Sequence, residues 1–404
     1  MNKRAREIDI LTIIEKLDIS PSMYKNATDK YNSIANYLNS HGLNADIYPQ
    51  GSFALGTVIK PYSEDRERRY DLDFVCQVSS LRKDISAKEL LETVEDVLKS
   101  GDLYGGKLHI SDECITIEYA DINNVGFSID IVPAIDERPD VKEVLKRISE
   151  RPELIETSIR IPKYSNGEKY KWLTNNPKGY KQWFLEINAP FESCSGEFFC
   201  EHYYMSNRCE FNSVEEIPED LHRSSLQRVI QILKYHRDVY FSHITNGAVV
   251  KPISAIVNTI VTGIAANVRP DISIFELLRY VLEELSLYEG ILNDRNLFRR
   301  NNPLRQIIQR NENGWIIQNP ANPGDNLANE WNENKSIPIY FFKWIKACNT
   351  QLLLSMDLPD EEFRSNIENA FGQSVVQKHW GQKYSSESPK PISYSGYAKP
   401  WRKK

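Results

Sequence analysis

The sequence lacks any run of eighteen or more apolar residues, which excludes a membrane-spanning helix of ordinary length. It also lacks an excess of positive charge: the formal net charge is −6, whereas broad binding to nucleic acid relies on many lysine and arginine contacts to phosphates. We therefore expect no stable complex with a nucleic-acid polymer. Residues 1–7 are charged and hold no signal-peptide core, so a cytoplasmic protein is expected.

Cysteine is also scarce, with six residues in 404. In a cytoplasmic protein, reduced thiols are the default. Cys194, Cys200 and Cys209 nevertheless cluster, with His202 between them and His222 after them, and such a group can hold zinc. Zinc ligands usually include cysteine pairs about two to four residues apart, whereas these are separated by five and eight residues. We keep zinc binding as a minor alternative.

A glycine-rich run at 50–57 (QGSFALGT) is the first feature that points to a chemistry. Glycine lets the backbone approach a phosphate closely, and a turn that leads into a helix offers free N–H groups. On its own, a Gly-Ser pair is more often a simple turn. Nineteen positions after Ser52 comes Asp71-Leu72-Asp73. Together the two motifs predict a nucleotidyltransferase active site, with Gln50, Gly51 and Ser52 at the phosphates.

The two aspartates of the second motif are expected to project together. In an extended strand, side chains two residues apart share a face, so Asp71 and Asp73 lie on one side while Leu72 and Phe74 lie on the other. Two carboxylates so close repel each other unless a cation lies between them. Hard divalent ions with oxygen ligands, above all Mg²⁺, suit this arrangement. The motif therefore predicts a metal site.

Catalysis by two metal ions, about 3.5–4 Å apart, calls for a third carboxylate. Segment 125–133 alternates apolar and polar positions, with Asp130 on the polar face. Residues 114–119 predict a neighbouring strand, and a hairpin between the two would carry Asp130 to Asp71 and Asp73. We predict that these three aspartates are both the catalytic residues and the metal ligands.

Two other acidic residues compete with Asp130 for this role. Asp121 belongs to the expected turn of the hairpin, and Glu118 lacks a partner at the right place, so strand geometry favours Asp130. Any one aspartate taken alone is most simply a solvated strand position, because charged residues are usually exposed. Three of them together with a phosphate loop favour the catalytic interpretation.

These residues carry a resemblance to a known family. The chain resembles the cGAS/DncV-like nucleotidyltransferases, bacterial relatives of cyclic GMP-AMP synthase and oligoadenylate synthetase, over about residues 15–385. The matching segments are 17–20 with the helix that follows to Leu38, Gly51-Ser52, Asp71-Leu72-Asp73, 128–133, 172–177, 226–238, and Asn319-Pro320 leading to Asn326 and Trp331.

The resemblance implies further binding residues. In the family, a lysine on a helix and a serine about twenty residues later hold the donor triphosphate, and Lys234 and Ser254 stand at this distance. The alternative is a snorkelling lysine and an N-cap serine. His236 is expected to be structural, because a metal-activated hydroxyl needs no histidine base. Segment 319–324 predicts a turn and is a secondary candidate for lining the site.

The resemblance also implies an activity: synthesis of a cyclic di- or trinucleotide second messenger with release of pyrophosphate, in anti-phage defence. The substrates would be ATP with GTP or another nucleoside triphosphate, and the cofactor two Mg²⁺ ions, with Mn²⁺ as a substitute. Operon-encoded regulatory or conjugating proteins would be partners, although the ending Trp401-Arg402-Lys403-Lys404 has no small terminal residue for conjugation. The alternatives are a nucleotidyltransferase that modifies a protein or RNA end, and a non-catalytic binding module.

We expect an α+β fold: a two-lobed, polymerase-β-like nucleotidyltransferase core of mixed sheet and helices, plus a C-terminal helical bundle. Residues 1–42 would form helices that back the core, 43–215 the catalytic core and a connector, 216–384 the helical lobe and 385–404 a flexible tail. Helices are predicted at 87–99, 221–240, 254–265, 272–287, 341–354 and 361–371.

Overall fold

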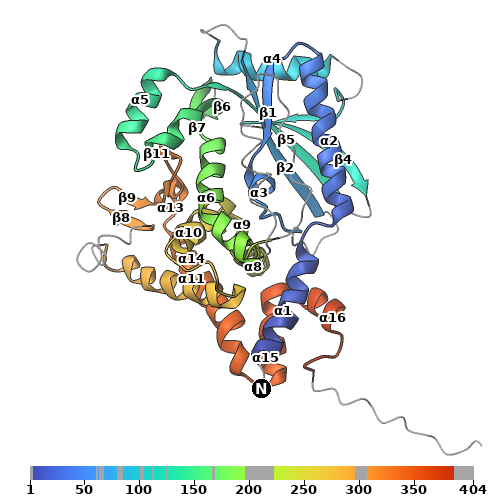
Figure 1. The fold of residues 1–404 in the computed structure, drawn as a ribbon, viewed down its shortest axis with the longest axis vertical. Coiled ribbons are helices and arrows are strands. Elements are labelled where there is room, and N and C mark those ends of the chain that lie inside the picture. The colour runs from blue at the N-terminus through green and yellow to red at the C-terminus, as the bar shows by residue number, and fades with distance from the viewer. Residues whose placement is uncertain are drawn as a thin grey trace, which may run out of the picture.

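The computed structural model has two lobes (Figure 1). One is a sheet with helices and the other is a larger set of helices, and helix α6 (Pro177–Ser195) leads from the first to the second. Among the described residues, no helix is long and apolar enough to cross a membrane. The residues that the structure describes are 3–60, 62, 68–79, 85–100, 104–111, 113–122, 125–165, 169–195, 223–295 and 307–385.

The sheet positions the aspartates. Its strand order is β1-β2-β5-β4-β3, and β6 and β7 extend it from the end of β5. Strands β2 and β5 are parallel, and the other pairs are antiparallel. The predicted hairpin is therefore present as β4 and β5, with β5 next to β2. The bounds are β1 (Ala45–Pro49), β2 (Arg68–Val78), β3 (Leu108–Ile110), β4 (Ile115–Ile122), β5 (Val125–Asp136), β6 (Ile159–Ser165) and β7 (Lys169–Asn175).

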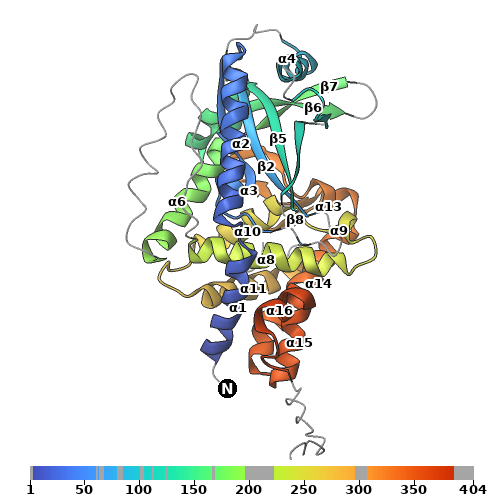
Figure 2. The same ribbon diagram turned by 90° about the vertical axis from the view of Figure 1, so that its right-hand side faces the viewer.

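Two helices, α2 (Pro21–Ser40) and α4 (Ala87–Lys99), cover one face of this sheet (Figure 2). Ser20 caps the first with a proline at its start, and Ser86 with Glu89 forms a capping box on the second. The apolar stripes of both helices bury the strand side chains that alternate with the aspartates, among them Leu72. The opposite face of the sheet is left for the site.

The segment between the lobes is more regular than expected. The segment predicted as a connector contains α5 (Pro139–Ile148), the 3-10 helix η1 (Pro152–Thr157) and the helix α6 (Pro177–Ser195). Pro190 inside α6 and its mixture of polar and aromatic residues hide the helical period. Helix α6 packs on the helical lobe through Phe184 and Phe191.

The helical lobe surrounds α8 (Ser225–Ser242), which is buried along nearly its whole length. The expected boundary near 215 and most of the expected tail lie outside the described residues. The remaining elements are α9 (Gly247–Val250), α10 (Ser254–Ala265), α11 (Ile274–Tyr288), η2 (Glu289–Leu292), β8 (Gln309–Asn311), β9 (Gly314–Ile316), β10 (Gln318–Asn319), β11 (Asn322–Asn326), α13 (Asn329–Glu333), α14 (Ser336–Cys348), η3 (Asn349–Leu353), η4 (Leu354–Asp357), α15 (Asp360–Phe371) and α16 (Gln373–Trp380).

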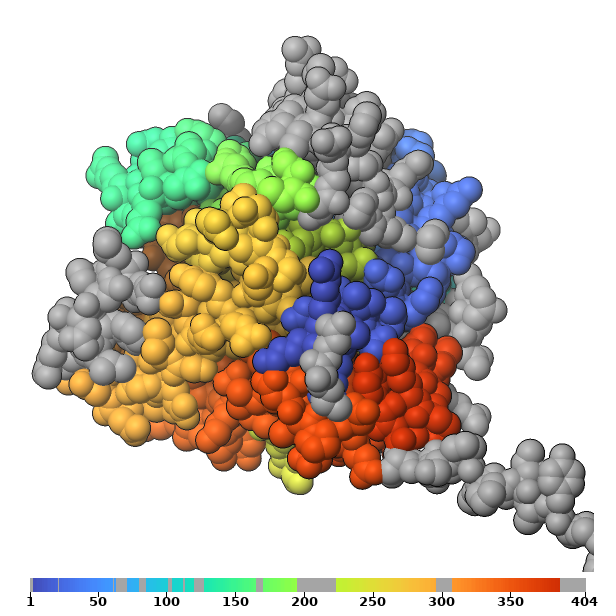
Figure 3. Space-filling view, turned by 60° about the horizontal axis from the view of Figure 1, so that its bottom comes forward, coloured from blue at the N-terminus to red at the C-terminus, as the bar shows by residue number. Residues whose placement is uncertain are grey.

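Helix α1 (Lys3–Leu17) packs in a different place from the one expected. Its apolar stripe joins the core of the helical lobe, not the sheet, and it lies against the C-terminal helices (Figure 3). Buried Arg6 donates to the carbonyls of Met356 (2.9 Å) and Leu358 (2.8 Å), and Trp380 donates to the carbonyl of Asp9 (3.1 Å). Of the two N-terminal helices, only α2 backs the sheet.

Candidate active site

The phosphate loop is seated directly on strand β2. The backbone N–H of Gln50 donates to the carbonyl of Asp73 (2.8 Å), and the short helix α3 (Gly51–Ala54) follows. Gly51 has φ +63°, and a Cβ atom there would lie 2.7 Å from Oδ2 of Asp73. Only glycine combines this left-handed conformation with such a close approach. The loop and the second aspartate of the motif thus form one unit.

Three side chains of α8 hold the residues that follow the loop; we call Gln227, Gln231 and Lys234 the carbonyl clamp. They are spaced four and three residues apart, so they lie on one face of the helix. All three are buried. Their bonds run from Gln227 Nε2 to the carbonyl of Leu55 (2.9 Å), from Gln231 Nε2 to that of Val58 (2.7 Å) and from Lys234 Nζ to that of Thr57 (2.9 Å). The clamp joins the two lobes at the phosphate loop.

The three aspartates lie together on the open face of the sheet. In the parallel register of β2 and β5, Asp73 is opposite Asp130, and Asp71 is opposite Ser128. The Ser128 hydroxyl donates to Oδ1 of Asp71, and the Thr116 hydroxyl donates to Oδ1 of Asp130 (2.6 Å). Two of the three carboxylates are therefore turned toward neighbouring hydroxyl groups.

Electrostatics at this face favour a cation. Burial and the neighbouring charges of Asp130 and Asp71 raise the pKa of Asp73 to about 7, against the pull of Lys234. Burial also raises the pKa of Asp130, although its bond from Thr116 opposes this. Within the described part of the chain, no three acidic, histidine or cysteine side chains converge closely enough to hold one ion. The donor set of hard oxygens in adjacent register nonetheless fits Mg²⁺ once the carboxylates turn from their hydroxyl donors.

The two alternatives to Asp130, Glu118 and Asp121, lie on the neighbouring strand β4. Glu118 is opposite Ser128 in the antiparallel register, so it shares the open face, but its carboxylate contacts His109 (3.9 Å). Asp121 is in the last residues of β4, not in a turn, and its side chain lies outside the described set. Only Asp130 is paired in register with Asp73.

Lys234 and Ser254 both reach the site, and each is held by a protein group. Burial and the charge of Arg237 lower the pKa of Lys234 to about 7, which Asp238 and Asp73 partly oppose. Lys234 is 4 % exposed, so it does not snorkel. Ser254 is the first residue of α10, whose N-cap is Ile253, and the Ser254 hydroxyl accepts from Arg237 (3.1 Å).

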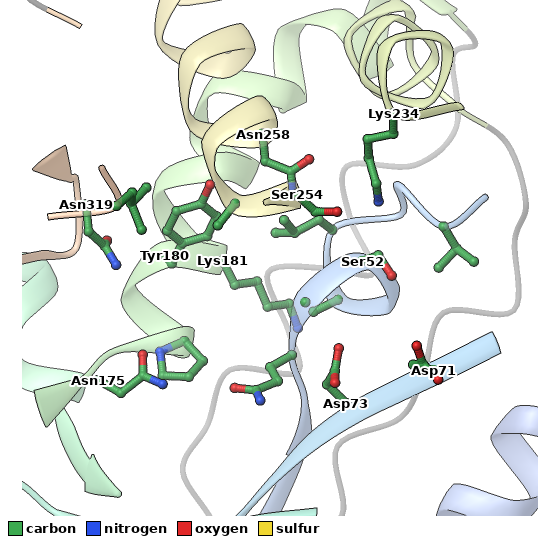
Figure 4. Close-up of a pocket in the computed structure, with 18 of the residues that line it drawn as sticks. Ser52, Asp71, Asp73, Asn175, Tyr180, Lys181, Lys234, Ser254, Asn258 and Asn319 are labelled. Carbon is green, nitrogen blue, oxygen red and sulfur yellow. The ribbon is translucent and has the colours of Figure 1, made fainter. Parts of the chain in front are cut away.

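These elements enclose a cavity of about 490 Å³ between the lobes (Figure 4). Every predicted nucleotide-binding residue lines it: Gln50, Gly51, Ser52, Lys234 and Ser254. So do Asp71 and Asp73, while Asp130 lies beside Asp73 in the sheet. The volume is that of an ordinary small-molecule site. Sequence reasoning did not single out several further polar lining residues, among them Asn175, Tyr180, Lys181, Asn258 and Asp325.

The cavity has two ends. We call the region of Ser52, Asp71, Asp73 and Lys234 the phosphate end; Asn175 and Asn319 lie at the opposite side, which we call the far end (Figure 4). Asp325 belongs to the far end because it accepts from Nδ2 of Asn319 (3.0 Å). The two ends are thus built from different elements, with β7 and the β10–β11 ribbon at the far one.

The predicted turn at 319–324 is part of this ribbon. Asn319 reaches the cavity, whereas Asn326 and Trp331 support the ribbon from outside it. The Asn326 side chain accepts from the N–H of Ile317 (3.0 Å) and donates to the carbonyl of Trp315 (2.9 Å). Trp331 is buried in the helical lobe. Asn175 and Asn319 belong to segments that carry the family resemblance, but no local pattern places them beside Asp325, so the fold brings these residues together.

Comparisons with known proteins agree with this geometry. Residues 8–188 match the family described as Second Messenger Oligonucleotide or Dinucleotide Synthetase domain. A protein named c-di-GMP synthase, from Roseivirga ehrenbergii, is 23% identical over 362 residues, which are 86% of this chain and 79% of that protein. The chain is similar to the cGAS/DncV-like nucleotidyltransferases.

Solved structures of this family share the fold. The CD-NTase CdnG of Bradyrhizobium diazoefficiens, solved with GTP, matches with a TM-score of 0.61 at 18% identity over 91% of this chain and 96% of that one. CdnC from E. coli MS115-1, solved as a CdnC:HORMA-deltaN complex, matches with a TM-score of 0.57 at 15% identity over 91% and 96%. The predicted α+β fold class is confirmed, and the comparisons support the predicted family resemblance and nucleotidyltransferase activity.

Two remaining predictions for this nucleotidyltransferase concern histidine and cysteine. His236 is fully buried outside the cavity, accepts from Trp344 (3.1 Å) at Nδ1 and bonds Gln351 (2.9 Å) through Nε2. Burial lowers the pKa of His236 to about 4, so it is a neutral structural residue. Of the suggested zinc group, Cys194 is exposed at the end of α6, and its partners at 200, 202, 209 and 222 lie outside the described residues.

Proposed function

We propose that this chain synthesises a cyclic oligonucleotide, a di- or trinucleotide, from nucleoside triphosphates. The observation that carries the proposal is a cavity in which the Gly51-Ser52 loop, backed by the carbonyl clamp, faces Asp71 and Asp73, with Asp130 in register beside them. The relative named c-di-GMP synthase supports a cyclic product.

The chain's own residues have distinct roles in this proposal. Ser52, Lys234 and Ser254 bind the triphosphate, and its ribose and base extend toward the far end. Asp71, Asp73 and Asp130 bind two Mg²⁺ ions, or Mn²⁺, which supply charge neutralisation and acidify a hydroxyl group when bound. The acceptor ribose hydroxyl attacks the α-phosphate, its proton leaves to a nearby carboxylate or to solvent, and pyrophosphate departs. A second transfer within the linear product closes the ring.

The biological setting is part of the proposal. We place the enzyme in the cytoplasm and in anti-phage defence, where its product would act as a signal. One structural neighbour was solved as a complex with a HORMA protein, which supports a protein partner that regulates this chain too. An operon-encoded conjugating enzyme is the other partner that the family resemblance suggests.

The competing function is transfer of a nucleotide to a protein or an RNA end. It would use the same carboxylates, so the acceptor decides between the two. We therefore propose incubating the purified chain with α-³²P-labelled nucleoside triphosphates and Mg²⁺, followed by phosphatase treatment and mass spectrometry. Phosphatase-resistant small products are expected. Label retained on the protein or on added RNA would favour the competing function, and no transfer at all would contradict both.

A further inference from the structure

The far end of the cavity offers a fixed pattern of hydrogen-bonding groups. Asn319 receives the N–H of Ala321 at its Oδ1 (3.0 Å), which leaves Nδ2 to bond Asp325 (3.0 Å). Asn175 receives the N–H of Asn176 at its Oδ1 (2.7 Å). Both amides are therefore oriented by backbone donors, and each exposes its NH₂ group on the other side.

Two polar groups at this end have no partner within the described residues. One is the second carboxylate oxygen of Asp325, because only Oδ2 accepts from Asn319. The other is Nδ2 of Asn175, since its Oδ1 alone is engaged. Both residues line the cavity. Their elements touch: Asn322 of β11 donates to the carbonyl of Thr174 (3.0 Å), the residue before Asn175 on β7.

The far end therefore presents an acceptor and a donor from adjacent elements. An ionised carboxylate only accepts, and an amide NH₂ only donates. Guanine has the complementary edge, with donors at N1 and the 2-amino group beside the acceptor O6. Adenine has an acceptor at N1, which would face the carboxylate of Asp325 and be repelled. Burial and the charge of Glu113 raise the pKa of Asp325, which means that they disfavour its ionised form. Two neutral N–H donors from a ligand would stabilise that carboxylate.

We propose that Asp325 and Asn175 select guanine: Asp325 accepts from N1–H and the 2-amino group, Asn175 donates to O6, and Asn319 positions Asp325. This rests on the proposed function only in that the ligand is a nucleoside triphosphate with its phosphates at the other end. Asp325 and Asn175 are thus specificity-determining residues, and GTP is a substrate.

The test compares equilibrium binding of three nucleotides, GTP, ITP and ATP, by calorimetry, with pyrophosphate release measured separately. ITP keeps N1–H and O6 but lacks the 2-amino group. The wild-type chain should bind GTP more tightly than ITP, and ITP more tightly than ATP. The lost bond from the 2-amino group and the mismatch at N1 should each change affinity about tenfold to a hundredfold.

Variants separate the two contacts. Asp325→Asn keeps an oxygen for Asn319 but replaces the other by NH₂, so the GTP-to-ITP ratio should fall to about one. Asp325→Glu retains the carboxylate and should keep GTP ahead of ITP. Asn175→Leu should weaken GTP and ITP equally, because O6 is common to both. The matched control is Glu113→Gln, which removes a carboxylate that influences Asp325 without lining the cavity, and should leave the ratio unchanged.

The outcomes are distinguishable. Equal binding of GTP and ITP by the wild type, or an unchanged ratio in Asp325→Asn, overturns the guanine proposal even where pyrophosphate is released. Selective binding that Asp325→Asn abolishes, without any pyrophosphate release, supports the guanine proposal and overturns the proposed function. Binding and release that both follow the expectations support the two together.

Discussion

The phosphate end and the far end of the same cavity are built in opposite ways. At the phosphate end, side chains of α8 satisfy three backbone carbonyls within residues 55–58, and a Cβ atom at position 51 would lie 2.7 Å from Oδ2 of Asp73. At the far end, oriented amides and Asp325 leave polar groups without partners among the described residues. The first arrangement suits a reaction that is the same for every nucleotide. The second leaves polar groups that can distinguish one nucleotide base from another.

The largest effect should come from the carboxylates of the phosphate end. Asp73→Asn removes a metal ligand in the proposed site, so pyrophosphate release should fall by at least about a thousandfold. The exposed Asp29 on α2, across the sheet, supplies the control variant Asp29→Asn, which should keep full activity. If Asp73→Asn kept more than about a tenth of the wild-type rate, the catalytic centre would not lie at the phosphate end.

Lys234 should show a trade-off between binding and stability. Lys234→Met should raise KM for the nucleotide about tenfold or more, because a cation next to the phosphates is lost. With a pKa of about 7 in the folded chain and about 10.5 unfolded, Lys234 binds its proton more weakly when folded. The wild type should therefore gain stability as pH rises through 7 toward 10, and lose it as pH falls.

The sign of that pH dependence is the sharper measurement. As the pH falls from 9 to 6, the wild type should lose about 1–2 kcal/mol of unfolding free energy that Lys234→Met keeps, because the variant has no buried amine to protonate. Chemical denaturation at the two pH values measures this difference. A pH-independent difference between the two proteins would mean that Lys234 titrates normally, in contact with water.

A smaller effect is expected at the clamp. Gln231→Met loses the bond to the carbonyl of Val58, so the loop should be less ordered and KM should rise about threefold to tenfold with little change in kcat. Gln351→Met breaks the partly buried bond to His236 and serves as the matched control. Both variants should lose about 1 kcal/mol of stability, but only the first should move KM. Equal kinetics in the two variants would make the clamp purely structural.

The smallest effect should come from Asn258, one turn after Ser254 on α10. Its Oδ1 is buried without a partner in the described structure, so Asn258→Leu should raise the unfolding free energy by about 0.5–1 kcal/mol. KM should change by less than about threefold, and the GTP-to-ITP ratio should stay the same. A large change in this ratio would mean that Asn258 on α10 takes part in base recognition together with the far end.

The phosphate end could be predicted because its signals are local. Alternation places Asp71 with Asp73, and the same period places Asp130 on the open face of its own strand. Helices α4 and α10 occupy the predicted ranges, 87–99 and 254–265, because an apolar stripe marks each helix and a capping box at Ser86 marks the start of α4. The resemblance added Lys234 and Ser254, which line the cavity as expected.

The remainder depended on tertiary contacts that no local pattern encodes. The stripe of α1 predicts an amphipathic helix but not which of two cores receives it. Nor does the sequence reveal that Lys234 already donates to the carbonyl of Thr57, because that bond joins residues 177 positions apart. Asp325 and Asn175 are 150 positions apart (325 − 175) and come together only through the contact of β11 with β7.

The packing of α1 against the last helices bears on how the chain is made. The sheet and the helices that cover it draw their core from residues 19 to 172, so this lobe has all its parts while the chain is still growing. The helical lobe does not, because Arg6 needs carbonyls at 356 and 358, and the carbonyl of Asp9 needs Trp380. Since synthesis proceeds from the N-terminus, α1 can pack in its final place only after residues 356–380 have been made. The carbonyl clamp belongs to the lobe that closes late, so a growing chain assembles its carboxylates well before it acquires a complete phosphate end.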